Sequence, residues 1–407
     1  MNPINQPITL PCRAILKNRL VKAAMTERMS NSSYEPTEAH QNLYKIWAET
    51  GAGLLITGNV MIDKNHMESA GNIFMGDEKM IPKLKDWSDS SKGPGNHIWT
   101  QISHSGRQTN RFVNPRPKAP SAIQLKKLWL FGKPQPMTES DIQEVIQGFA
   151  KAAKISQESG FTGIQIHAAH GYLLSQFLSP KTNHRTDKWG GSLENRSRLL
   201  LEIIRVCRKT VGNEFPISVK INSSDFQRGG FTEEDSLIVV KKLEEEGIDL
   251  LEISGGTYEK AAFFMGNDKK KESTIKREAY FLDFAKKVRE VCDVPLMITG
   301  GFRSFNFCND VLGEGDCDLI GMGRPFIGNY NIMGDFLHGK IPYLENPPIR
   351  TGFSAFEDAA EGGYYARQLI NIAEGRGLKP NLNPMASSMF IVKHEFKKAR
   401  QKSRKAK

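Results

Sequence analysis

Cysteine is scarce in this 407-residue sequence. The five cysteines are scattered along the chain, and no two of them have the C-x-x-C spacing of a disulfide framework or a cysteine-ligated metal. We therefore expect neither a disulfide framework nor a cysteine-ligated metal. A reducing, cytoplasmic compartment fits this cysteine usage best.

Long hydrophobic runs are also missing. No apolar run approaches the roughly 20 residues that a membrane-spanning helix needs. The first residues, MNPINQPITLPCR, have no basic stretch followed by an apolar core, so we do not expect a signal peptide. No G-x-G-x-x-G pattern follows a predicted strand, and a separate dinucleotide-binding domain is not expected. With 39% hydrophobic residues the chain can still bury a substantial core.

Positive charge is concentrated at one end of the sequence. Of the formal net charge of +11, residues 393–407 carry +7, because eight Lys or Arg residues stand there against Glu395 alone. We expect this stretch to be a solvated, partly disordered basic tail. The excess charge therefore does not indicate a specific nucleic-acid partner, and at most predicts weak attraction to anionic polymers or lipids.

Eight short apolar or β-branched runs between residues 19 and 323 predict strands, and each run closes on a small or polar residue. They are Arg19–Ala23, Gly53–Met61, Ile98–His104, Gly163–Ala168, Ile217–Ser223, Leu250–Gly255, Leu296–Gly300 and Leu319–Gly323.

Helical periodicity separates the later strands. Apolar residues recur at helical spacing in Asp141–Ser159, Leu193–Val211, Glu233–Glu246, Lys276–Val291 and Ser304–Gly313, and Thr232 is a predicted N-cap.

Strands that alternate with helices pair in parallel through right-handed crossovers. Eight of them favour a closed (β/α)8 TIM barrel over an open sheet. We place this single barrel domain at residues 1–335, followed by a C-terminal helical extension at 336–392. The Pro-rich and basic segment Gly106–Pro136 is expected to cross the mouth of the barrel.

The densest group of reactive side chains follows the fourth predicted strand. His167 and His170 are three residues apart, and Tyr172 comes two residues later. On a tight turn at the rim of a barrel these side chains can converge on one space. The two imidazoles could then donate hydrogen bonds to a carbonyl or nitro oxygen, and the phenol could supply a proton. The same histidine spacing could hold a divalent metal, but no further carboxylate or cysteine stands at ligand spacing, so no metal site is expected. In the remaining alternative, His167 and His170 are loop residues without a catalytic or binding function.

The segment His167–Ile204, HAAHGYLLSQFLSPKTNHRTDKWGGSLENRSRLLLEII, resembles the Old Yellow Enzyme family. Paired histidines followed by N-x-R-T-D-x-x-G-G-S-x-E-N-R-x-R are highly diagnostic of that family, and the resemblance recurs in order at every predicted strand end up to about residue 330. It implies a TIM barrel that holds FMN and takes a hydride from NADH or NADPH.

The resemblance also implies which residues hold the flavin. Backbone groups of the first strand end and the Thr26 hydroxyl would contact the ring, Gly58 would leave room for it, and the Gln101 amide would pair with its pyrimidine edge. Lys220 would balance the negative charge of reduced FMN, since an inward-facing lysine is costly without a negative partner. The phosphate would bind at the ends of the last two strands. The complete set is Ala23, Ala24, Met25, Thr26, Gly58, Gln101, Lys220, Gly300, Gly301, Gly323 and Arg324.

The sequence departs from the family pattern at one position of the predicted pocket. Arg28 stands where some relatives have an aromatic substrate contact, so we place it among the substrate-binding residues with His167, His170 and Tyr172 without inferring a particular substrate. The segment Gly255–Phe281 is a predicted loop over the mouth, and its Tyr258, Phe263 and Phe264 could wall the pocket. We treat His104 as structural.

The resemblance therefore implies an FMN-dependent oxidoreductase that reduces activated carbon–carbon double bonds in enones, enals or nitroalkenes. Hydride would pass from flavin N5 to the β-carbon, and Tyr172 would protonate the α-carbon. Two kinds of alternative stay open: a phosphate-binding aldolase barrel with Lys220 as a Schiff-base lysine, and a protein without catalysis that carries flavin or binds a partner through its basic tail. A homo-oligomer in which the segment after residue 340 reaches a neighbouring copy is also left open.

Overall fold

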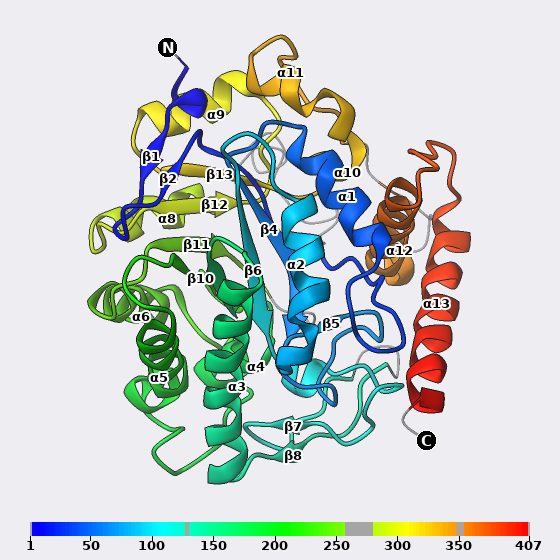
Figure 1. Cartoon of the computed structure of the whole chain (residues 1–407). Coiled ribbons are helices and arrows are strands. Elements are labelled where there is room, and N and C mark those ends of the chain that lie inside the picture. The colour runs from blue at the N-terminus through cyan, green and yellow to red at the C-terminus, as the bar shows by residue number, and fades with distance from the viewer. Residues whose placement is uncertain (1, 127–129, 257–279, 347–348, 350–353, 406–407) are drawn as a thin grey trace.

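A computed structural model of the chain describes residues 2–126, 130–256, 280–346, 349 and 354–405. Its centre is a closed barrel of eight parallel strands, which helices surround (Figure 1). The strands follow the order β3-β13-β12-β11-β10-β9-β6-β4, and a pairing between β3 and β4 closes the barrel. The predicted (β/α)8 fold is confirmed.

Each of the eight predicted runs forms one barrel strand. Their bounds are β3 Leu20–Lys22, β4 Leu54–Met61, β6 His97–Ser103, β9 Ile164–Ala168, β10 Ile217–Asn222, β11 Leu250–Ser254, β12 Leu296–Thr299 and β13 Leu319–Met322.

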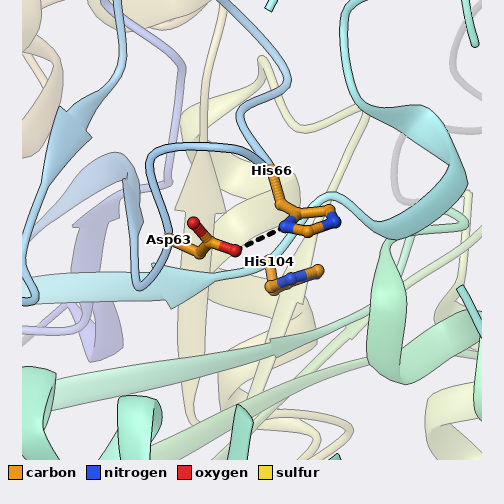
Figure 2. Close-up of side chains that lie close together, drawn as sticks. All are labelled: Asp63, His66 and His104. Atoms are coloured by element: carbon orange, nitrogen blue, oxygen red, sulfur yellow. Dashed lines mark hydrogen bonds and ion pairs between the residues drawn. The ribbon is translucent and has the colours of Figure 1, made fainter. Parts of the chain in front are cut away.

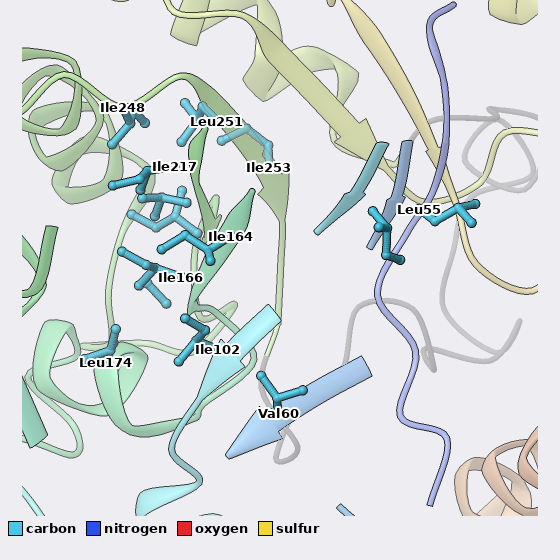
Figure 3. Close-up of a cluster of buried hydrophobic side chains, with 14 of the residues drawn as sticks. Leu55, Val60, Ile102, Ile164, Ile166, Leu174, Ile217, Ile248, Leu251 and Ile253 are labelled. Carbon is cyan, nitrogen blue, oxygen red and sulfur yellow. The ribbon is translucent and has the colours of Figure 1, made fainter. Parts of the chain in front are cut away.

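Alternation along the strands divides the apolar side chains into two layers. The outer layer, which includes Ile164, Ile166, Ile217, Leu251 and Ile253, packs against the surrounding helices (Figure 3). The inner layer fills the barrel itself and consists of Val21, Leu54, Ile56, Trp99, Leu250, Met297 and Leu319. The antiparallel pair β1 (Ile8–Thr9) and β2 (Ile15–Leu16) adds Leu10, Cys12 and Leu16 to this inner layer and so plugs the barrel.

Helices at the predicted places cover the barrel. The outer helices are α1 Glu38–Ala48, α2 Ile81–Ser90, α3 Glu139–Glu158, α5 Leu193–Val211, α6 Glu233–Glu245, α8 Leu282–Arg289 and α9 Phe305–Gly313. Helix α6 begins after Thr232, whose side chain accepts a hydrogen bond from the Asp235 amide as the N-cap prediction requires. Helices α1 and α2 were not among the predicted helices.

Shorter elements lie between these helices and strands. They are η1 Pro3–Asn5, β5 Ile73–Phe74, η2 Glu78–Met80, η3 Gly106–Gln108, β7 Lys118–Ala119, β8 Gln135–Pro136, α4 Leu173–Leu178, α10 Pro325–Gly328, η4 Tyr330–Ile332 and α11 Met333–Leu337. The expected excursion at 106–136 contains η3 and the small parallel sheet β7–β8. Tyr258, Phe263 and Phe264 of the predicted mouth loop lie outside the described residues.

The C-terminal part forms two helices, α12 (Ser354–Ala373) and α13 (Pro384–Lys405), which pack against each other. Helix α13, red in Figure 1, continues through residues 393–405, where the sequence led us to expect a partly disordered basic tail. Its polar side chains explain the order. Glu395 and Lys402 are buried, and Lys398 donates to the Ser30 carbonyl at 2.6 Å while Lys402 donates to the Ser30 hydroxyl at 3.0 Å. The basic residues thus meet backbone and hydroxyl acceptors that the sequence pattern did not reveal.

No helix of the described part is both long and apolar enough to cross a lipid bilayer.

Glu395 is the central contact between α13 and the rest of the fold. Its carboxylate accepts hydrogen bonds from Ser69 Oγ at 2.5 Å and the Ala70 amide at 2.7 Å, and it pairs with Arg28 Nη1 at 2.8 Å. Because removal of one partner leaves buried polar groups unsatisfied, we expect Glu395→Ala to lower the free energy of unfolding by about 2–4 kcal/mol. Urea denaturation measures this change. Lys393→Ala, which removes an exposed charge from the same helix, is the control, and equal midpoints for the two variants would contradict the assignment.

Candidate active site

A layer of polar side chains lies inside the barrel, on the inward positions of neighbouring strands. Gln101 Nε2 on β6 donates to Gln165 Oε1 on β9 at 2.7 Å, and Gln165 Nε2 donates to Glu252 Oε2 on β11 at 2.7 Å. Lys220 Nζ on β10 lies 2.9 Å from the other Glu252 oxygen, Oε1. All four side chains are buried, and none of them faces the outer helices. The structure therefore places Lys220 inward, as predicted, but with a carboxylate partner.

The predicted cluster of two histidines and one tyrosine forms at the end of β9. The ring centroids of His167 and His170 are 5.2 Å apart, and those of His167 and Tyr172 are 4.8 Å apart. His170 has φ +60°, in the left-handed region that non-glycine residues seldom occupy, and the bond from its amide to Asn222 Oδ1 at 3.0 Å stabilises the turn. Tyr172 precedes α4 and turns its phenol to the Glu68 carboxylate.

Both imidazoles are neutral at neutral pH. Burial lowers the pKa of His167 and of His170 well below 6.5, and the positive charge of Lys220 lowers both further. The Ala169 amide donates to His167 Nδ1 at 3.2 Å, so the neutral ring carries its hydrogen on Nε2. His167 therefore presents a hydrogen-bond donor, while His170 Nε2 lies 2.8 Å from Ser254 Oγ.

The segment that follows β3 packs against Gly58 of β4. The pairing of β4 with β6 shifts by one residue between Ile56 and Asn59, and this irregularity turns Asn59 inward opposite Gln101. A Cβ atom at Gly58 would lie 2.3 Å from the Met25 carbonyl oxygen and 2.3 Å from a Glu27 carboxylate oxygen. Packing within the protein therefore requires glycine at position 58. The sequence analysis had instead explained Gly58 by the room that a flavin ring needs.

Glu68 is a buried carboxylate that the sequence analysis did not identify. It accepts hydrogen bonds from the Tyr172 and Thr26 hydroxyls and, at 2.8 Å, from Asn59 Nδ2. Burial raises the pKa of this carboxyl, although the positive charge of Arg28 and the bonds from Thr26 and Asn59 oppose the rise. Glu68 therefore joins the predicted Thr26 to the predicted Tyr172.

The predicted phosphate-binding residues lie at the ends of β12 and β13. Gly300 and Gly301 have φ +131° and +96°, conformations that residues with a Cβ rarely adopt. A Cβ at Gly323 would be 3.5 Å from Met25 Sδ, which places this strand end beside the first. Arg324 pairs with Glu361 of α12.

Arg28, for which a substrate contact was expected, pairs with a residue of α13. Its φ is +63°, and its guanidinium forms the ion pair with Glu395 of α13. Arg28 thus links α13 to the segment that follows β3, and a direct substrate contact stays a prediction.

Asp63, His66 and His104 form a compact group whose ligand atoms lie within 4.8 Å of one another (Figure 2). His66 Nδ1 is 2.5 Å from Asp63 Oδ2, and His66 Nε2 accepts a hydrogen bond from the Lys118 amide at 2.8 Å. Although burial opposes the change, the hydrogen bond from His66 lowers the pKa of Asp63 to about 2. Both nitrogens of His66 are therefore engaged by protein groups, and the stacked His104 accepts from the Gly106 amide. This bonding fits the structural role expected for His104 and does not indicate a metal centre.

Sequence reasoning found one partner of each important contact and missed the other. Glu252 and Gln165 carry a recognisable signal, because each is a polar residue with an apolar neighbour on both sides in a predicted strand, LLEIS and GIQIHA. Glu68 carries none, since it lies in the loop between β4 and β5, and only the folded chain brings it to Tyr172.

Comparison with known proteins agrees with this architecture. The sequence pattern of the NADH:flavin oxidoreductase / NADH oxidase family matches residues 3–339. The chain is 39% identical over 350 residues to the NADH-dependent flavin oxidoreductase iliE of Neonectria sp. (strain DH2), a match that covers 80% of this chain and 45% of that protein. This chain thus spans less than half the length of that relative.

A second relative is matched over most of its length. The chain is 38% identical over 361 residues to the NADH-dependent flavin oxidoreductase nadA of Aspergillus parasiticus, covering 84% of this chain and 80% of the relative. Among solved structures, an old yellow enzyme homologue from Zymomonas mobilis aligns with a TM-score of 0.71 over 84% of this chain and 94% of that one. At 24% identity this likeness shows the shared fold.

The residues present fit an FMN group. The Gln101 amide offers both a donor and an acceptor to a pyrimidine edge, and the Lys220 ammonium has three hydrogens, of which Glu252 needs one. Gly300, Gly301 and Gly323 leave the backbone approachable beside Arg324, as a phosphate requires. These residues would hold the flavin.

The neutral histidines predict a pH-dependent stability. Below about pH 6.5 the unfolded chain binds protons at positions 167 and 170 while the folded rings stay neutral, so stability falls with decreasing pH by up to about 1.4 kcal/mol per pH unit for each histidine. Other buried histidines contribute to the same fall, and the difference in slope between variants is therefore the quantity to measure. Denaturation between pH 5 and 7 should give a shallower slope for the His167→Asn/His170→Asn double variant than for the wild type. His184→Asn, which removes an exposed ring, should keep the wild-type slope; identical slopes in all three proteins would contradict the prediction.

Proposed function

This chain belongs to the NADH:flavin oxidoreductase / NADH oxidase family, and we propose that within it the chain is an ene-reductase acting on enones, enals and nitroalkenes. Family membership makes it a flavin-dependent oxidoreductase that uses FMN with NADH or NADPH as the hydride donor. The finer proposal is carried by one observation: a phenol and two neutral imidazoles meet at a single turn of the barrel mouth.

When bound, FMN would supply the hydride chemistry, which is storage of a hydride from the nicotinamide for delivery to an electron-poor alkene carbon. The protein must then stabilise the charge that the alkene acquires. His167 Nε2–H is suited to donate to the carbonyl or nitro oxygen on which that charge develops, and His170 is the second candidate donor. A neutral donor suits this purpose because it gives a hydrogen bond without losing its proton to the product.

Proton delivery falls to Tyr172. Its phenol is buried, lies against the His167 ring and belongs to the same turn, so substrate held by the imidazoles would lie beside the hydroxyl. The proton goes to the α-carbon of the alkene, where hydride addition leaves an electron pair. General acid catalysis by a positioned side chain typically contributes about 10²–10⁴-fold to a rate.

Lys220 serves as the fixed positive charge of the site. Its ion pair with Glu252 holds the ammonium in place, ready to face additional negative charge on a bound flavin. The same pairing gives no support to the alternative of a Schiff-base aldolase, since the nucleophile in that chemistry is a neutral amine. Borohydride trapping with a carbonyl substrate should accordingly leave no adduct on Lys220.

The purified protein should carry a visible flavin spectrum that anaerobic NADH or NADPH bleaches and 2-cyclohexenone restores. Lys220→Met should lower flavin retention or slow the bleaching by at least about tenfold, because a buried charge and its bond to Glu252 are lost. Arg205→Met, which removes an exposed arginine of α5, is the matched control. A holoprotein that bleaches but never regains its colour with any enone, enal or nitroalkene would contradict the ene-reductase proposal and leave the family assignment intact.

Tyr172→Phe separates the two half-reactions. We expect reoxidation by 2-cyclohexenone to slow by about 10²-fold or more, because the proton donor is gone, while reduction by NADH keeps its wild-type rate. Stopped-flow absorbance follows both half-reactions on the same sample. Equal slowing of the two would remove Tyr172 from the proton-donor role.

A further inference from the structure

Glu68 is a buried carboxylate of the site to which the proposed function assigns no role. It is 8% exposed, and its two oxygens accept from three side chains, Tyr172, Thr26 and Asn59. Two of these three, Tyr172 and Thr26, are predicted site residues. A buried carboxyl group that contacts the proton-donating phenol is a candidate for the chemistry itself.

The fold holds Glu68 in this position from both sides. Ser69 and Ala70, the next two residues, bind the Glu395 carboxylate of α13. On the other side, the irregularity in β4 turns Asn59 toward Glu68. Because both anchors are buried, the carboxyl cannot easily swing away to solvent.

The chemistry of Tyr172 creates a need that Glu68 can meet. A phenol with an ordinary pKa near 10 that gives its proton to carbon becomes a phenolate, and a buried phenolate without a positive partner is costly. A carboxylic acid next to the phenol oxygen can supply a replacement proton as the first one leaves. The resulting carboxylate keeps the hydrogen bonds of Thr26 and Asn59 and lies near the positive charge of Arg28.

We propose that Glu68 is the proton-relay partner of Tyr172: it orients the phenol and returns a proton to it during reduction of the alkene. This role rests on the proposed function, since it acts through Tyr172.

The relay balances in protons and charge. The Tyr172 O–H bond breaks and its proton forms a C–H bond at the α-carbon, using the electron pair that hydride addition leaves there. The Glu68 O–H bond breaks at the same time, and its proton forms the new O–H bond of Tyr172. Tyr172 ends neutral and Glu68 ends as a carboxylate, which regains a proton from water before the next cycle.

The groups around Glu68 act on the proton affinity of its carboxyl in both directions. Burial raises the pKa of Glu68, and the negative charge of Glu395 acts in the same direction. The positive charge of Arg28 and the hydrogen bonds from Thr26 and Asn59 oppose this rise in pKa. The charged groups that face Glu68 are thus Arg28 and Glu395, with Tyr172 as its titratable contact.

Glu68→Gln tests the relay with little change of shape, since an amide can still bond to Tyr172, Thr26 and Asn59. We expect reoxidation of the reduced holoprotein by 2-cyclohexenone to slow by roughly 10- to 100-fold, with NADH reduction unchanged. The wild-type reoxidation rate should fall as pH rises through the pKa of Glu68, and this fall should be absent from the variant. Glu246→Gln, which removes a carboxylate paired with Arg205 away from the site, should behave as the wild type.

A double-mutant cycle distinguishes a relay from two separate effects. In a relay, Tyr172→Phe/Glu68→Gln is no slower than Tyr172→Phe alone, because Glu68 acts only through the phenol. Rates that multiply, or a Glu68→Gln variant at the wild-type rate, would overturn the inference. If Tyr172→Phe itself reoxidises normally, the proposed role of Tyr172 fails and the relay fails with it; if only Glu68→Gln is normal, the relay alone fails.

Infrared spectroscopy gives a reading that does not depend on turnover. The difference between wild type and Glu68→Gln at neutral pH should contain the C=O stretch of a protonated carboxylic acid, which disappears at higher pH. A carboxylate band in its place at every accessible pH would overturn the relay even if both proteins fold and bind flavin.

Discussion

The constraint on which this site depends is the closure of eight parallel strands into one barrel. Closure makes every second side chain of each strand point to the axis, where it has no water to bind. Near the plugged end these positions are apolar, and toward the mouth they become Gln101, Gln165, Lys220 and Glu252. Each polar group there must find its partner on another strand.

The inward polar layer therefore functions as one unit. Lys220 and Glu252 are almost fully buried, and loss of either would leave an uncompensated charge, which typically costs about 3–5 kcal/mol. Gln165 connects this pair to Gln101. A ligand that binds at the mouth meets side chains whose positions are already determined, and such preorganisation is the main way in which protein dipoles stabilise developing charge.

The C-terminal helix adds a second layer of control from outside the barrel. Glu395 on α13 holds Arg28 and the loop that carries Glu68, so residues more than 300 positions apart share one network of hydrogen bonds. The family pattern ends at residue 339, and this helix lies beyond it. The part of the chain beyond the family pattern thus supports loops of the barrel.

The sequence by itself determined the barrel, because strand and helix periodicities are local and each of the eight runs closes on a recognisable residue. It also determined the His167, His170 and Tyr172 cluster, since three residues on one turn need no distant contact to lie together. What only the tertiary structure decided is the set of partners: Glu252 for Lys220, Glu395 for Arg28 and Glu68 for Tyr172. Each of these pairs joins different strands, loops or helices. Composition and spacing do not indicate which distant residue will be the partner of a buried polar or charged group. The contacts of the basic segment have the same origin, because its acceptors at Ser30 and Asn72 are brought to it only by folding.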